Sequence, residues 1–286
     1  MTTEKPKRRL PEWLKRPMPA SEIFNKTGDT LSDLGIQTIC TNANCPNLGE
    51  CWNKGTATVL ILGNICTRNC KFCSVGSGKP LPPDPTEPAR VAEMAKRLEL
   101  KYLVITSVNR DDLPDGGAEQ FRDVVNATRD TVDGIRFELL VPDFKGCVDM
   151  AMGILGDARP FVFGHNVETV PSLYPKARSG GDYKGSLELL AKAKKLWPQT
   201  ITKSSIMLGL GETDEQIKEV INDLLNVSCD RLAIGQYLKP SSESLEVVEY
   251  VHPDKFDYWA DYAEQQGFKW VMSSPFTRSS YHAEVS

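Results

Sequence analysis

The sequence lacks any apolar run long enough to span a bilayer, about 18 residues, and its first residues lack the apolar core of a secretory signal. A membrane span and translocation are therefore not expected. We predict a cytoplasmic protein, because clustered cysteines in that reducing compartment more often hold metal than form disulfides. Strong charge is also missing, since a net charge of -4 creates no general field that attracts nucleic acid or an anionic membrane. We expect neither as a partner.

Histidine is scarce as well. The three histidines, His165, His252 and His282, show no metal-ligand spacing, and each is expected to make an ordinary polar contact. Cysteine is plentiful by contrast, with eight residues in a chain of 286. A chain of this length buries roughly three quarters of its unfolded surface and needs no disulfides for stability. The cysteines therefore need another explanation.

The chain divides into three segments by pattern. Residues 1–55 are rich in Pro, Asn, Gly and Thr and predict an irregular N-terminal extension. Residues 56–272 alternate apolar runs with helical periodicity, as βα units do, and residues 273–286 form a C-terminal segment. Strands are predicted at 58–62, 102–106, 135–141, 161–164, 204–208 and 231–235, with a short last strand near 268–272. Six strands, each followed by a helix, indicate an α/β fold with a parallel sheet in a partial (β/α)6 TIM-type barrel.

A first group of three cysteines directly follows the first predicted strand. Cys66, Cys70 and Cys73 lie on one short loop, where three thiolates can hold three corners of a 4Fe-4S cluster and leave the fourth iron open. Barrel enzymes place their chemistry at this end of their strands. Zinc is the alternative, but a structural zinc site requires four ligands in closed geometry. We therefore favour the cluster.

A second group lies in the extension. Cys40, Cys45 and Cys51 occupy a polar, loop-like stretch, although unpaired structural cysteines are normally buried as small hydrophobic residues. We therefore predict a second cluster there. The remaining two, Cys147 and Cys229, are expected to be core thiols.

These motifs resemble those of a known family. The CxxxCxxC loop with an aromatic residue before its last cysteine resembles the radical S-adenosylmethionine (SAM) superfamily. The CPNxxECW sequence through Trp52 and the Arg278-Ser279-Ser280-Tyr281 segment are similar to the lipoyl synthase family, over residues 36 to the end. The resemblance implies that Ser280 ligates the fourth iron of the auxiliary cluster. A serine oxygen is a harder ligand than a thiolate and should be easier to displace, which suits a cluster consumed as sulfur donor.

The resemblance also suggests where SAM binds, with its amino and carboxylate groups on the open iron. Glycines after the second strand would let backbone approach its methionine end, and residues after the fourth strand would contact its ribose or carboxylate. Glu168 is equally a helix N-terminal acid, Arg178 a possible carboxylate partner, and Gly211 equally a plain turn. The predicted contacts are Asn109, Asp111, Gly116, Gly117, Asn166, Glu168, Arg178 and Gly211.

The implied activity is sulfurtransferase chemistry on an octanoyl group amide-linked to a lysine of a lipoyl carrier domain. Hydrogen abstraction at C6 and then C8 would let each carbon take a sulfur from the auxiliary cluster, with two SAM molecules consumed per product. The implied partners are a 2-oxoacid dehydrogenase subunit or the glycine cleavage H protein, a reductant such as flavodoxin or ferredoxin, and cluster-assembly proteins. Two alternatives stay open: the second cluster is an electron relay, or the protein is a non-catalytic zinc or iron-sulfur scaffold.

Overall fold

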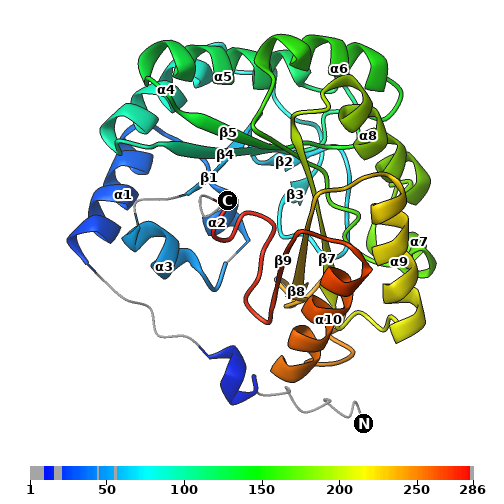
Figure 1. Ribbon diagram of the computed structural model, residues 1–286. Helices are drawn as coiled ribbons and strands as arrows, with labels where there is room; N and C mark the ends of the chain where they lie inside the picture. Colours follow the sequence, from blue (N-terminus) through cyan, green and yellow to red (C-terminus); the bar gives the residue numbers. More distant parts are fainter. Residues whose placement is uncertain (1–9, 16–20, 44, 55–56, 284–286) are drawn as a thin grey trace.

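The fold is built on one parallel sheet that curves into part of a barrel (Figure 1). The computed structural model describes residues 10–15, 21–43, 45–54 and 57–283. The sheet has seven strands in the order β1-β4-β5-β6-β7-β8-β9, and every neighbouring pair is parallel. Their bounds are β1 Thr58–Ile61, β4 Tyr102–Ser107, β5 Arg136–Leu140, β6 Val162–Gly164, β7 Ile201–Leu208, β8 Arg231–Gln236 and β9 Trp270–Ser274. The predicted partial barrel is confirmed.

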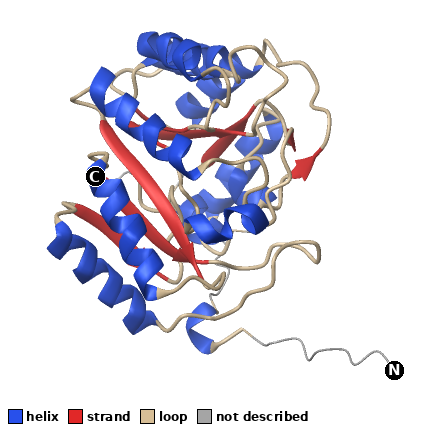
Figure 2. Ribbon diagram, turned by 90° about the vertical axis from the view of Figure 1, so that its right-hand side faces the viewer, coloured by secondary structure: helices blue, strands red, loops and turns tan. Residues whose placement is uncertain are grey.

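Helices cover the outer face of the curved sheet, as the turned view shows (Figure 2). The helices that follow the strands are α4 Glu87–Arg97, α5 Ala118–Thr131, α6 Val148–Leu155, α7 Tyr174–Ala177, α8 Tyr183–Leu196, α9 Asp214–Asn226 and α10 Pro253–Gln266. Short 3-10 turns lie at η1 Glu12–Leu14, η2 Gly156–Ala158 and η3 Pro171–Leu173, and the cysteine loop pairs β2 Ile65–Cys66 with β3 Gly76–Ser77. Among the described residues, no helix is both long enough and apolar enough to cross a membrane.

Alternating side chains of the strands separate the outer core from the barrel interior. In β4, Leu103 and Ile105 join the large core beneath the helices. Tyr102 and Val104 instead form a small separate cluster with Ala283 of the C-terminal segment. Because side chains alternate along a strand, β4 packs on its helices with one face and turns the other inward.

The barrel interior contains a buried ion pair near the amino-terminal ends of β5 and β7, which the sequence did not reveal. Lys203 Nζ lies 2.9 and 3.2 Å from the two carboxylate oxygens of Glu138, which also accepts a hydrogen bond from the Tyr102 hydroxyl at 2.9 Å. Both charged side chains are almost fully buried. Strand β7 was predicted to start at residue 204 but begins at Ile201, because Lys203 is neutralised and can be buried inside the sheet.

The extension is more helical than predicted. Helix α1 spans Glu22–Asp33, and the short helices α2 Ile39–Asn42 and α3 Leu48–Asn53 follow it. The Ser21 side chain caps α1, and Phe24 packs on Trp52 with ring centroids 5.2 Å apart. The apolar residues of α1 recur at helical spacing, so the prediction of an irregular extension missed an amphipathic helix. Contacts with α3 add to its stability. An antiparallel bridge from Thr38 to Val59 then places the extension beside the first strand of the sheet.

Candidate functional site

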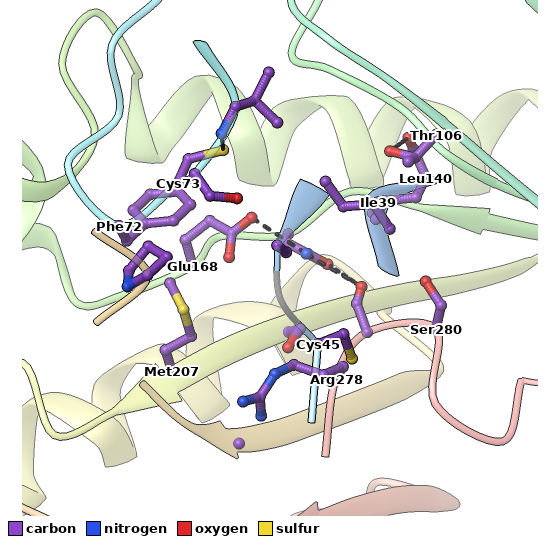
Figure 3. Close-up of a pocket in the computed structure, with 18 of the residues that line it drawn as sticks. Ile39, Cys45, Phe72, Cys73, Thr106, Leu140, Glu168, Met207, Arg278 and Ser280 are labelled. Atoms are coloured by element: carbon purple, nitrogen blue, oxygen red, sulfur yellow. Dashed lines mark hydrogen bonds between the residues drawn. The ribbon is translucent and has the colours of Figure 1, made fainter. Parts of the chain in front are cut away.

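A cavity of about 780 Å³ opens at the carboxyl ends of the strands. Both cysteine groups face it, together with the predicted iron ligand of the C-terminal segment. These lining residues are Cys40, Cys45, Cys51, Cys66, Cys70, Cys73 and Ser280. In the close-up, Cys73 and Glu168 lie on one side, while Cys45, Arg278 and Ser280 lie on the other (Figure 3). Residues from three distant parts of the chain therefore meet in one chamber.

Backbone amides hold the sulfur atoms of the first group. The Cys66 Sγ accepts from the Asn109 N–H at 3.3 Å and from the Arg68 N–H at 3.4 Å, and the Cys73 Sγ accepts from the Val75 N–H at 3.4 Å. Hydrogen bonds to cluster-ligating sulfurs are one of the means by which proteins set a cluster's reduction potential. Two of the three thiols in this loop thus have amide donors already in place.

A buried arginine fastens this loop to the sheet. The Arg68 guanidinium donates to Asp143 at 2.5 and 2.8 Å and to Asp111 at 2.6 and 2.8 Å. Burial alone would raise the pKa of Asp143, but the hydrogen bonds and charge of Arg68 outweigh it and hold that pKa below its ordinary value. Arg68 lies between two of the cysteines, so it couples their loop to the ends of β4 and β5.

The second group is built by the two short helices of the extension. Cys40 lies in α2 and Cys51 in α3, and the Cys45 N–H between them donates to the Cys40 carbonyl at 3.0 Å. Cys40, Cys51 and Ser280 also line a second, smaller cavity of about 30 Å³. This shared lining places the serine beside the thiols with which it was predicted to act.

One hydrogen bond joins the two cysteine segments directly. The Ser74 hydroxyl, next to Cys73, donates to the carbonyl of Asn42, two residues after Cys40. The two segments are therefore fixed relative to each other, although Asn42 and Ser74 are 32 positions apart in the sequence and β1 lies between them. A substrate in the cavity would meet both groups.

The donor chemistry fits iron-sulfur clusters better than a single metal ion. In the described part of the chain, no three His, Cys, Asp or Glu side chains close around one ion position. A cubane has a separate iron for each ligand, so its cysteines need not converge on one point. Burial raises the pKa of Cys40 to about 11 and that of Cys70 to about 12, so loading either group with metal must displace thiol protons. Three thiols, and three thiols with a hydroxyl, are the expected donor sets.

Four of the eight predicted SAM contacts line the cavity: Asn109, Asn166, Glu168 and Arg178. Glu168 has a positive φ of 69° and is half-buried in the cavity wall, and burial raises its pKa although Arg178 opposes this. Asn166 Nδ2 donates to Glu168 at 3.2 Å, and Arg178 donates to the Asn166 carbonyl at 3.0 Å. The three side chains form one polar group at the end of β6, suited to an amino acid and ribose.

The structure does not bring the other four contacts to the cavity. Asp111 is held by Arg68 and Thr67 instead. Gly116 and Gly117 have φ of 64° and 91°, and a Cβ on Gly117 would lie 2.4 Å from a Leu62 methyl. These glycines serve the left-handed turn into α5 and its close approach to β1 rather than the cavity wall. Gly211, with φ of 109°, lies in the turn before α9, as the plain-turn interpretation allowed.

Sequence reasoning missed several residues of the site. His165, expected to make an ordinary polar contact, is enclosed: its Nδ1 faces the Val141 carbonyl at 2.9 Å and its Nε2 faces Ser186 at 3.0 Å. Burial, with Arg178 nearby, lowers the pKa of His165 to about 4. Arg68 lies between Cys66 and Cys70, and a charged residue at this place in the loop could have been recognised from the sequence as part of the site. Met207 and Tyr237 also line the cavity, at the ends of β7 and β8.

The other two cysteines lie apart from the cavity lining. Cys229 is buried in the core, as predicted, and Cys147 directly precedes α6 and packs partly against the same core. Neither sulfur belongs to the two groups described above. Substitutions of Cys147 and Cys229 can therefore serve as controls for substitutions of the six cysteines at the cavity.

Comparisons with known proteins agree with this arrangement. Residues 60–224 match the radical SAM superfamily, and residues 1–45 match the N-terminal domain of lipoyl synthase. The lipoyl synthase of Caldanaerobacter subterraneus subsp. tengcongensis is 50% identical over 277 residues, which are 97% of this chain and 96% of that protein. The lipoyl synthase of Chromobacterium violaceum is 48% identical over 279 residues, 98% and 89% of the two chains.

Solved structures share the fold at low sequence identity. Streptococcus suis SuiB bound to S-adenosylmethionine has a TM-score of 0.60 and 14% identity, over 79% of this chain and 54% of SuiB. The FeFe-hydrogenase maturase HydG from Carboxydothermus hydrogenoformans has a TM-score of 0.57 and 12% identity, over 92% of this chain and 69% of HydG. These similarities support the partial barrel alone, whereas the full-length sequence matches define the family. The chain belongs to the lipoyl synthase family of the radical SAM superfamily.

Proposed function

We propose that the two cysteine groups hold two 4Fe-4S clusters that serve one substrate in the shared cavity. Cys66, Cys70 and Cys73 would hold the SAM-binding cluster, and Cys40, Cys45, Cys51 and Ser280 the auxiliary cluster. The reaction is the insertion of two sulfur atoms, at C6 and C8, into a protein-bound octanoyl-lysine. The observation that carries the site assignment is that one cavity is lined by all seven residues.

When bound, SAM and its cluster supply a radical able to abstract aliphatic hydrogens, and the auxiliary cluster supplies the sulfur. The side chains of this chain bind and orient the reactants. Asn166, Glu168 and Arg178 offer an amide, a carboxylate and a guanidinium, respectively, for the polar parts of SAM. We assign Asn109, next to the cysteine loop, to the same role, and we do not retain Gly116, Gly117, Asp111 or Gly211 as direct contacts.

The remaining wall suits an acyl chain. Apolar side chains from helix α2, the first cysteine loop and four strands or their adjoining loops line the cavity, and polar atoms make up the smaller part of its surface. The relevant residues are Ile39, Leu60, Phe72, Val108, Leu140, Ile206 and Met207. An octanoyl chain gains about 0.8 kcal/mol for each methylene it buries. Apolar burial would therefore hold the chain between the two clusters while its carbons react.

We propose three functional segments with the boundaries expected from the sequence. Residues 1–55 carry the auxiliary cluster, 56–272 form the SAM barrel, and 273–286 cover the barrel mouth. The packing of Ala283 against Tyr102 and Val104, and the position of Ser280 at the cavity, support the covering role. The extension depends on the barrel for its packing, so we expect the segments to fold together.

We further propose the partners of the reaction. The octanoylated carrier is a lipoyl domain of a 2-oxoacid dehydrogenase subunit or the glycine cleavage H protein. A flavodoxin or ferredoxin supplies electrons, and cluster-assembly proteins restore the auxiliary cluster. A reducing cytoplasm suits an enzyme that needs six free cysteines.

Anaerobic turnover with an octanoyl-lysyl peptide tests the proposal. The reconstituted protein, with SAM and reductant, should give a peptide product carrying two added sulfurs by mass spectrometry. Cys45→Ala should lose sulfur insertion while the other cluster still cleaves SAM. Cys147→Ala, a cysteine outside the cavity, is the matched control and should retain product formation. Normal product from Cys45→Ala would contradict the assignment of the second cysteine group.

A further inference from the structure

The C-terminal segment is held at two points by the loop that carries the second cysteine group. The Asn47 side-chain amide donates to the Phe276 carbonyl at 2.7 Å. The Tyr281 hydroxyl donates to the Glu50 carboxylate at 2.8 Å, and the His282 Nε2 lies 3.2 Å from the other oxygen of that carboxylate. Asn47 and Glu50 are the non-cysteine polar residues of the Cys45-to-Cys51 motif, and no role follows for them from the cluster ligands alone.

Their places in the sequence matter. Asn47 lies two residues after Cys45, and Glu50 directly precedes Cys51. Asn47 is 1% exposed, so its hydrogen bond to the segment is made away from water, where a buried amide without a partner is costly. The two contacts lie on either side of Ser280 along the C-terminal segment, at Phe276 and at Tyr281.

Other contacts fix the same segment to the barrel. Ser279 and Asn166 exchange hydrogen bonds at 3.2 and 3.3 Å, and Ala283 is buried against Tyr102 and Val104. Ser280 thus lies between a residue tied to β6 and a residue tied to α3. Glu50 links the two most directly, because it precedes Cys51 in the sequence and contacts Tyr281, which follows Ser280.

We infer that Asn47 and Glu50 are positioning residues that hold Ser280 against the second cysteine group. The inference rests on the proposed function, which makes Ser280 an iron ligand. A single hard, displaceable ligand needs to be kept close by its surroundings, because its own bond to iron contributes less than a thiolate does. Groups that orient metal ligands from outside the ligand set are a recognised means of tuning metal retention. Here the same short loop supplies thiols and the anchors of the oxygen ligand.

Tyr281→Phe is the mildest test, since it removes only the hydroxyl that donates a hydrogen bond to Glu50. Glu50→Ala removes the anchor for both Tyr281 and His282. In the holoprotein, the rate at which a chelator removes iron from the auxiliary cluster should rise about 10-fold in Glu50→Ala and less in Tyr281→Phe. The cluster at Cys66, Cys70 and Cys73 serves as the internal reference, and its rate of iron loss should not change.

A matched control separates this effect from the loss of an ordinary helical ion pair. Glu93→Gln breaks an i,i+4 pair with Arg97 on α4, as Glu50→Ala breaks one with Lys54 on α3. Glu93→Gln should leave both rates of iron loss unchanged. An effect of that control equal to the effect of Glu50→Ala would overturn the inference.

A double variant decides whether Glu50 acts through the serine. If it does, Glu50→Ala should add little to the rate of iron loss in a Ser280→Ala background. Additive effects would overturn the inference and leave Glu50 a stabiliser of α3. Failure of the proposed function looks different, because the unmodified protein would then hold only one cluster, or its second cluster would survive turnover without giving sulfur to the product. Unchanged iron loss in both Glu50→Ala and Tyr281→Phe, with two clusters present, would refute the positioning role alone.

Discussion

Replacing Arg68 with Met tests whether a buried ion pair holds the first cysteine loop in place. The side chains of Arg68 and Asp143 are 6% and 7% exposed, whereas Asp111 is 37% exposed. Water screens the Asp111 pair, which contributes at most about 1 kcal/mol. The Asp143 pair is largely desolvated, so the loss of its cation dominates the effect.

The expected cost of Arg68→Met is about 3–5 kcal/mol in the free energy of unfolding, because Asp143 is left as a buried, uncompensated carboxylate. Without Arg68, burial of Asp143 is no longer offset by the arginine's hydrogen bonds and charge, so we expect the pKa of Asp143 to rise in the variant. The penalty in the variant is therefore present at neutral pH and declines as the pH falls toward that raised pKa. Asp143→Asn added to Arg68→Met removes the buried charge and should recover much of the loss.

Urea unfolding followed by circular dichroism, on anaerobically purified protein, measures these differences. Asp111→Asn is the internal comparison and should cost no more than about 1 kcal/mol. The reasoning fails if Arg68→Met lies within about 0.5 kcal/mol of the parent protein. It also fails if adding Asp143→Asn recovers nothing.

Two further predictions concern a buried histidine and a glycine in the turn before α5. His165 is neutral when folded, with a pKa near 4 against about 6.5 when unfolded, so the protein should lose about 2 kcal/mol between pH 7 and pH 5 that His165→Asn does not lose. Urea unfolding at both pH values checks this, and equal losses in parent and variant would contradict it. Gly117→Ala should cost about 2–4 kcal/mol through backbone strain and a clash with Leu62, whereas Gly134→Ala, which meets nothing within 4 Å, should cost only the strain. Thermal unfolding that ranks the two variants equally would remove the clash from the account.

The strands could be predicted because most are short apolar runs that lie between turn signals. The run at 58–62 is an example, and it differs from β1 by one residue. The place of the first cysteine group at the cavity could be predicted for a related reason, since its three cysteines are close in sequence and directly follow a strand. Local patterns of this kind can be interpreted without knowing which distant parts of the chain pack against them.

Features made by distant residues could not be predicted. Asp143 lies 75 positions from Arg68, and nothing in either segment indicates their pairing. The contacts that hold helix α1 on Trp52 are another example. The Thr27 hydroxyl donates to the Trp52 backbone carbonyl at 3.1 Å, and the Phe24 ring packs on the Trp52 ring. Gly116 and Gly117 were predicted to lie against SAM, whereas in the fold a Cβ on Gly116 would meet Phe144 and one on Gly117 would meet Leu62.

The central claim is that the second cysteine group holds the sulfur that enters the product. Its most direct test is a single anaerobic turnover by protein whose clusters were rebuilt with isotopically heavy sulfide, with ordinary sulfide absent from the assay. We expect the octanoyl-lysyl peptide product to carry only heavy sulfur. Iron should be lost from the group at Cys40, Cys45 and Cys51 and kept at Cys66, Cys70 and Cys73. A sulfur-containing product without the heavy isotope, or an auxiliary cluster that survives turnover intact as an electron relay would, contradicts the central claim.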